Sequence, residues 1–284
     1  PEKIVVPPYL VDTPETRDGL SRYYAEITYM DSQVGEMLQH LRDSDQADNT
    51  VVIWLSEQGS QLPFGKWTCY DMGIHAAAIV RMPGTVDPNT ESDALISYVD
   101  IVPTFVEFAG GDPERLDVDG KSFATLLRGE TDLHHDFVFS TNTTRGIHRG
   151  SEAFATRSVT DGKWLYLRNL HSESEFKNVI TEKDPVFRSW KTADSEIAAE
   201  RVHAYSFRAA TELYDLDSDP WCMKNLAGQT DLKSTERILD QALTAWMNRQ
   251  GDLGDATERA AKTRQPKFKP WTKPNGYAVE RPSS

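Results

Sequence analysis

Two oxygen-bearing side chains, Glu57 and Gln58, follow directly on an apolar run over residues 51–55, and Gly59 comes next. The run is typical of a buried strand, and α/β folds bind metals and anions at the carboxyl ends of such strands. Carboxylate and amide oxygens suit a hard divalent cation. Lys66 follows a few residues later and could place an ammonium against an oxyanion. The pattern therefore favours a site for a cation and an anionic group.

Further candidate side chains lie in the segment 143–150, which holds Arg145 and His148. Arginine suits bidentate recognition of oxyanions, and loops that follow strands often carry function. We therefore expect Arg145 and His148 to bind substrate, with a solvated turn as the alternative. His75 could also reach a substrate, and a partly buried structural histidine is its alternative. The histidine pair at 134–135 has no carboxylate at metal-ligand spacing, so we assign it no function.

The elements that must position these side chains begin with a long helix. Thr13, Pro14 and Glu15 provide a threonine cap, a proline in the first turn and an early acid, which together predict a helix start. Apolar residues then recur every three or four positions to about Leu41, as in an amphipathic helix. Strands are predicted over 51–55, 76–81, 96–100 and 137–140, a short helix over 101–109, and a helical turn within 120–129.

The pattern changes after about residue 150, where apolar and polar residues alternate. Alternation is typical of antiparallel strands covered on one face, and Asp161-Gly162 indicates a hairpin turn. A helix over 232–248 should pack on this sheet, and Arg157 and Arg168 should face solvent. Strands are predicted over 153–159, 163–168 and 212–216, and the polar stretch from Gly251 should lie on the surface.

Composition limits the partners of this 284-residue chain. A net charge of −13 argues against nucleic acid as a partner, so an anionic ligand would be met by local cations. No apolar run is long enough to span a bilayer, and we expect no membrane partner. A hydrophobic content of 38% is enough for a core, and Cys69 and Cys222 could form at most one disulfide.

Several segments in a fixed order resemble one known family. Residues 51–84 resemble the signature SD(H/N)G…GK…R.PG, and residues 7–35 (PPYLVDTPETRDGLSRYYAEITYMDSQVG) resemble the helix that precedes it. The segments YVDIVPT, DGKS and ELYDL, the last of which leads to NLA at 225–227, follow in the same order. Over about residues 1–230 the chain resembles the formylglycine-dependent sulfatases of the alkaline phosphatase superfamily. It is similar to bacterial heparan N-sulfatase-like and polysaccharide sulfatases.

The resemblance implies an α/β fold, the mixed-sheet alkaline phosphatase-like fold of sulfatases. Residues 1–150 would form the C-terminal part of the large domain, and residues 151–284 a small subdomain with an antiparallel sheet, a packed helix and a polar tail. It also implies that Glu57 and Gln58 bind a divalent cation, usually calcium, and that Lys66 is catalytic because it bridges the sulfate and the nucleophile. Family members carry Asp and then Asn or His at the two metal positions, so both ligands depart from the pattern.

The activity implied is sulfuric ester hydrolysis, the release of sulfate from a sulfated carbohydrate. The family's Cys/Ser-x-Pro-x-Arg motif, whose first residue becomes the nucleophile formylglycine, does not occur in this sequence. We therefore expect the nucleophile in an N-terminal half of the same enzyme, upstream of this chain, and expect the chain alone to be inactive. The resemblance also favours a periplasmic or secreted location.

Two alternatives stay open. The first is a phosphoester hydrolase of the same superfamily, although such relatives often use histidine ligands and two zinc ions where this chain has Gln58. The second is a non-catalytic carbohydrate-binding or partner scaffold that has kept the fold.

Overall fold

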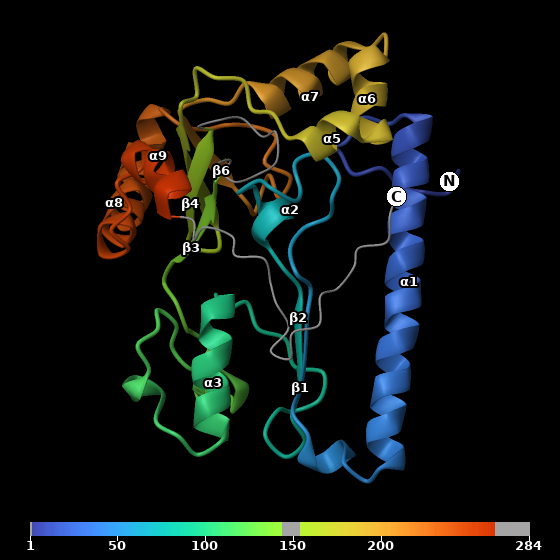
Figure 1. Cartoon of the computed structure of the whole chain (residues 1–284), viewed down its shortest axis with the longest axis vertical. Helices are drawn as coiled ribbons and strands as arrows, with labels where there is room; N and C mark the ends of the chain where they lie inside the picture. The colour runs from blue at the N-terminus through green and yellow to red at the C-terminus, as the bar shows by residue number, and fades with distance from the viewer. Residues whose placement is uncertain (1, 144–153, 265–284) are drawn as a thin grey trace, which may run out of the picture.

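The computed structural model describes residues 2–143 and 154–264. Its first long element is helix α1 (Pro14–Asp43), which runs along one side of the molecule (Figure 1). The Thr13 hydroxyl accepts a hydrogen bond from the Thr16 N–H at 3.1 Å, and Pro14 lies in the first turn. The predicted helix and its cap are confirmed.

Two short strands, β1 (Val52–Leu55) and β2 (Ala78–Arg81), form a two-stranded antiparallel sheet beside α1 (Figure 1). Val52 lies opposite Arg81 and Leu55 opposite Ala78. The predicted strands at 51–55 and 76–81 are confirmed, and the polar side chains after residue 55 stand where β1 ends.

The predicted strand over 96–100 is wrong. Tyr98–Asp100 form a 3₁₀ turn that leads directly into helix α3 (Ile101–Phe108). The cause is local, because the Asp100 carboxylate accepts the Ser97 N–H at 2.7 Å and so stabilises a turn instead of an extended chain. The predicted helix after it is confirmed, and Gly110 (φ +78°) follows its end; α4 (Ala124–Leu127) is the predicted turn.

A four-stranded antiparallel sheet forms the centre of the other half of the molecule. Its order is β3-β4-β5-β6, with β3 (Val138–Asn142) at one edge. The other strands are β4 (Ala155–Thr160), β5 (Trp164–Leu170) and β6 (Thr211–Asp215), so the predicted strands and hairpin are confirmed. The sheet includes β3 from before residue 150, and the division of the chain at that residue stays a prediction.

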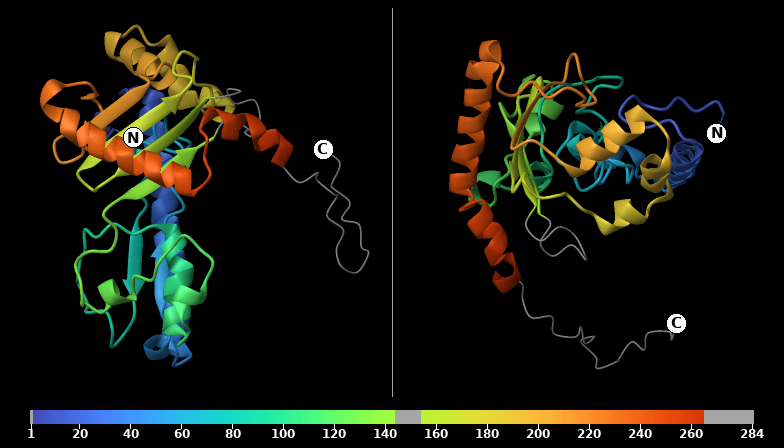
Figure 2. Two further views of the ribbon diagram at one scale, coloured as in Figure 1. Left: turned by 90° about the vertical axis from the view of Figure 1, so that its left-hand side faces the viewer. Right: turned by 90° about the horizontal axis from the view of Figure 1, so that it is seen from above.

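Both faces of this sheet are buried, which corrects the prediction of one covered face. Helix α8 (Lys233–Arg249) packs on one face, where Leu239 and Leu243 share a buried core with Val159, as the predicted helix over 232–248 should. Leu165 and other side chains of the opposite face join a second core. Figure 2 shows the sheet between α8 and the group of helices on its other side.

Arg157 is buried in this sheet, so the expectation that it faces solvent is wrong. Its Nε donates to Asp252 Oδ2 at 2.5 Å and its Nη2 donates to Glu258 Oε1 at 2.7 Å. Arg168 is also partly buried, against Asp240 of α8. Polar positions of the alternating pattern are therefore buried here because carboxylates from the C-terminal stretch neutralise them.

Several helices have no counterpart in the sequence analysis. Helix α9 lies within the polar stretch that was expected only to follow the surface, and it carries the buried Glu258. Helices α6 and α7 contribute Phe187, Trp190 and Tyr205 to the hydrophobic core. These helices are α2 (Asp71–Ile74), α5 (Val179–Lys183), α6 (Pro185–Thr192), α7 (Glu196–Ser206) and α9 (Asp255–Arg264), with 3₁₀ turns at Ala47–Asn49, Pro113–Arg115 and Thr230–Leu232.

Two sequence questions are answered by the described residues. Cys69 and Cys222 are both buried free thiols and do not form a disulfide. Within residues 2–143 and 154–264, none of the helices combines the length and the apolar character that crossing a bilayer requires.

Candidate active site

A compact loop after β1 brings Lys66 back to Glu57. The Lys66 N–H donates to the Ser60 carbonyl oxygen at 2.7 Å, which folds the loop on itself. A side chain at Gly59 would approach the Met72 carbonyl oxygen to 1.7 Å, and one at Gly65 would approach the Ser60 carbonyl oxygen to 2.2 Å. Both positions require glycine because the chain passes this close to itself.

Lys66 and Glu57 form an ion pair, with 3.5 Å between Nζ and Oε2. The Glu57 side chain is 82% exposed, whereas Lys66 is half-buried and its Nζ lies 5.4 Å from the centre of the Trp67 ring. The neighbouring Gln58 amide and the Lys66 ammonium hold the pKa of Glu57 below its ordinary value. The loop therefore presents a carboxylate, an amide and an ammonium together.

Buried hydrogen bonds fix this loop to the four-stranded sheet. The Tyr70 hydroxyl donates to Glu212 Oε2 at 3.0 Å, and the Tyr214 hydroxyl and Asn169 amide also donate to the Glu212 carboxylate. Burial, together with the Glu212 charge, raises the pKa of Tyr70 well above its ordinary value. Glu212 belongs to the ELYDL segment, so this late sequence motif anchors the loop that carries Lys66. The network was not foreseen from the sequence, although both of its segments were quoted in the resemblance.

The structure does not test the other three residues that the sequence predicted for the site. His75 is exposed, and its Nδ1 lies 3.3 Å from Asp71 Oδ2, which raises the pKa of His75 despite an opposing contribution from burial. Arg145 and His148 lie outside the described residues. A substrate-binding role for these three side chains stays a prediction.

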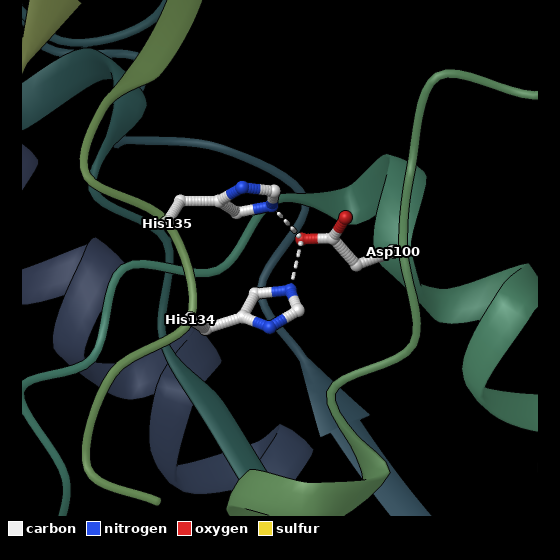
Figure 3. A group of neighbouring side chains, drawn as sticks. All are labelled: Asp100, His134 and His135. Atoms are coloured by element: carbon white, nitrogen blue, oxygen red, sulfur yellow. Dashed lines mark hydrogen bonds and ion pairs between the residues drawn. The ribbon is translucent and has the colours of Figure 1, made fainter.

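A second group of side chains, made of residues outside this loop, was missed by sequence reasoning. Asp100, His134 and His135 converge from the start of α3 and from the segment before β3 (Figure 3). His135 Nε2 lies 2.9 Å from Asp100 Oδ2, and His134 Nε2 lies 3.3 Å from the same oxygen. The carboxylate is 34 positions before the first histidine, so spacing along the chain could not reveal it. The only signal was the adjacent histidine pair itself.

Comparisons with known proteins agree with the fold and with the resemblance. A sequence model described as sulfatase matches residues 7–111, which include β1, the loop and α3. An ulvan-active sulfatase of Formosa agariphila is 34% identical over 232 residues, which are 81% of this chain and 44% of that protein. The human N-sulphoglucosamine sulphohydrolase is 26% identical over 274 residues, 87% of this chain and 51% of that protein.

A solved structure shares the fold. It holds a protein in complex with its substrate D-glucosamine-2-N,6-O-disulfate, and it matches with a TM-score of 0.59 and 19% identity over 81% of this chain and 40% of that one. The chain thus spans about half the length of the curated relatives it matches. The matched family model and these relatives show that the chain belongs to the sulfatase family and corresponds to the C-terminal part of its members.

Proposed function

We propose that this chain supplies the C-terminal part of an enzyme that hydrolyses sulfate esters or sulfamates on a carbohydrate. The observation that carries the proposal is the loop after β1, where Glu57, Gln58 and Lys66 stand together inside the segment that matches the sulfatase model. A sulfate monoester is an anion that needs cationic donors on its non-bridging oxygens during hydrolysis. Lys66 is held where it can supply one.

Lys66 is the side chain to which we assign the catalytic role. Its ammonium has three donors, and the pair with the exposed Glu57 carboxylate leaves donors for a sulfate oxygen. Trp67 and the folded loop restrict the position of Lys66, so little side-chain entropy remains to be lost on binding. Formylglycine, which the family uses as its nucleophile, would supply the attacking oxygen and does not come from this sequence.

The donor set at residues 57 and 58 fits a share of a divalent cation site. A carboxylate kept ionised by its neighbours and an adjacent amide are hard oxygen ligands, which calcium prefers. Calcium takes six to eight oxygens, so these two side chains would provide only part of its coordination. We propose that Glu57 and Gln58 hold the cation from one side and that calcium is the ion.

The rest of the coordination, and the nucleophile, would come from an N-terminal half of the same enzyme. Large apolar side chains are exposed along α1 and on α3, among them Tyr29, Met37 and Val102. Large exposed apolar side chains are typical of surfaces that another part of a protein covers, and the relatives have about as much chain again. We propose that this half covers the exposed faces of α1, β2 and α3.

The substrate class is proposed from the relatives. One relative is named for activity on ulvan, another for N-sulphoglucosamine, and the matching structure holds a disulfated glucosamine as substrate. All three names point to sulfated carbohydrate. With a net charge of −13, the chain would recognise such a polyanion through local cations, for which His75, Arg145 and His148 remain candidates. A periplasmic or secreted location is proposed on the resemblance alone.

The proposal is tested on the intact protein that contains this chain. Sulfate release from sulfated oligosaccharides is measured by ion chromatography, with and without chelator, beside phosphate release from a phosphomonoester. We expect sulfate release that falls on chelation and returns with calcium. Preferential phosphate release would favour the phosphoester hydrolase, and sugar binding without release of either anion would favour the non-catalytic scaffold.

A further inference from the structure

The cluster of Asp100, His134 and His135 shares no residue with the loop that carries Lys66, and the proposed hydrolysis assigns it no role. Three segments meet there (Figure 3). Asp100 directly precedes α3. The His135 N–H donates to the Leu95 carbonyl oxygen at 3.3 Å, and the Lys121 N–H donates to Asp100 Oδ1 at 3.0 Å. Backbone hydrogen bonds therefore hold the three ligand-bearing side chains in place before any ion binds.

The spacing of the ligand atoms matches a tetrahedral ion. In a tetrahedral zinc site with bonds of about 2.0 Å, neighbouring ligand atoms lie roughly 3.3 Å apart. The two Nε2 atoms lie 3.3 Å (His134) and 2.9 Å (His135) from Asp100 Oδ2. All three ligand atoms lie within 4.8 Å of one another, and in the part of the chain that the structure describes they are the group that could hold a metal ion.

Hydrogen bonding among these residues leaves one buried donor or acceptor unused. The His134 side chain is only 4% exposed, and its Nε2, aimed at the carboxylate, makes no hydrogen bond. Such an atom costs free energy unless something binds it. A bound cation would use this nitrogen, whereas a pure hydrogen-bonded cluster leaves it unsatisfied.

The surroundings prepare the three side chains to act as ligands. The Ser97 and Lys121 N–H groups donate to the two Asp100 oxygens and fix the carboxylate, as groups around metal ligands commonly do. Zinc binds the neutral form of an imidazole side chain, so uptake of the ion by the two histidines should weaken as pH falls. The Lys121 ammonium, which donates to the His134 carbonyl oxygen, is a nearby positive charge that opposes a cation.

We propose that Asp100, His134 and His135 bind Zn²⁺, at a site separate from the oxygen ligands Glu57 and Gln58. Two imidazole nitrogens and one carboxylate oxygen are a donor set that zinc takes and that calcium does not prefer. Water would take the fourth position, reached past His135, whose side chain is 21% exposed. The bound ion would fasten the segment before β3 to the start of α3.

The test uses Co²⁺ as a spectroscopic probe on the full 284-residue chain, freed of metal with chelator. We expect one equivalent of Co²⁺ to give the visible bands of a tetrahedral site, and an equivalent of Zn²⁺ but not a large excess of Ca²⁺ to remove them. Two variants, His134→Gln and His135→Gln, each remove one ligand. Each should weaken Co²⁺ binding at least about 10-fold, because even changes to groups around metal ligands weaken metal affinity by that much. Circular dichroism verifies that each variant is folded.

Two control variants locate the ion. His40→Gln changes an exposed histidine of α1, and Glu57→Gln changes the proposed calcium ligand; both should keep the Co²⁺ spectrum. Failure of the folded wild-type chain to take up Co²⁺ or Zn²⁺ would overturn the proposal and leave a hydrogen-bonded cluster. Unchanged uptake in the two histidine variants would overturn it as well. Since no step measures sulfate release, the result is independent of the proposed hydrolysis.

Discussion

The four-stranded sheet and helix α1 carry similar numbers of apolar side chains but treat them in opposite ways. The sheet is buried on both faces, between α8 and the core that contains Phe187, Trp190 and Tyr205. In α1 every residue from 22 to 32 is exposed, including Tyr29, and Met37 further along the helix is exposed as well. The sheet has buried its apolar surface, whereas α1 leaves much of its apolar surface exposed to solvent.

This difference separates stability from interaction. The sheet region contains the side chains that should determine whether the chain folds, because their burial supplies most of the favourable free energy. The exposed apolar residues of α1 and α3 contribute little to folding, and we propose that they contribute to assembly with the proposed N-terminal half. Substitutions in the two regions should therefore have different effects on the chain and on the intact protein.

The largest effect is expected from breaking the buried ion-pair network of the sheet. Arg157→Met leaves the carboxylates of Asp252 and Glu258 buried without their partner and should lower the free energy of unfolding by about 3–5 kcal/mol. The matched change Arg22→Met removes an exposed pair with Asp18 in α1 and should cost less than about 1 kcal/mol. Urea unfolding measures both. Equal losses would contradict the distinction between the regions.

A smaller difference is expected from apolar truncations. Leu243→Ala opens a cavity between α8 and the sheet, where Leu243 is fully buried, and should cost about 2–5 kcal/mol. Met37→Ala, at a side chain that is 67% exposed in α1, should change the stability of the chain by no more than about 0.5 kcal/mol. In the intact protein Met37→Ala should become more costly. If it stays neutral there, the proposed cover over α1 is wrong.

The smallest effect is a pH dependence at the contact of α9 with the end of β5. The hydrogen bonds of His171 with Asp255 and, second, with Glu173 raise the pKa of His171. Protonated His171 is thus favoured by folding, so its contribution is fully present below the unfolded pKa of about 6.5 and is lost as pH rises through the higher folded pKa. Amide exchange of α9 should be faster at pH 8.5 than at pH 5.5, after correction for intrinsic rates. His171→Gln should remove that difference, and a variant with an unchanged profile would assign it elsewhere.

Local patterns in the sequence predicted much of the fold. The threonine cap of α1, the Asp161-Gly162 hairpin and the apolar repeat of α8 are each set by residues within a few positions, and all three are confirmed. The prediction of a strand over 96–100 was wrong because Asp100 accepts hydrogen bonds from its own turn and from the Lys121 N–H. The prediction that Arg157 faces solvent was wrong for a different reason, because its partners Asp252 and Glu258 are about 100 positions away.

The candidate site divides in the same way. Glu57, Gln58 and Lys66 lie close in sequence, and the resemblance alone predicted that they share a site. In the structure Lys66 Nζ lies 3.5 Å from Glu57 Oε2. The Glu212 network and the cluster of Asp100 with the two histidines join distant segments. A single sequence carries no record of such contacts, so only the structure could bring them together.

The central claim is that Lys66 holds the sulfate during hydrolysis, and its most direct test is turnover by the intact protein. Lys66→Ala should lower the rate of sulfate release at least about 100-fold, the scale of losing one oxyanion donor. Lys163→Ala, at an exposed lysine in the turn between β4 and β5 that pairs with Asp217, should leave the rate unchanged. Near-normal turnover by a folded Lys66→Ala variant would remove Lys66 from the site and contradict the account.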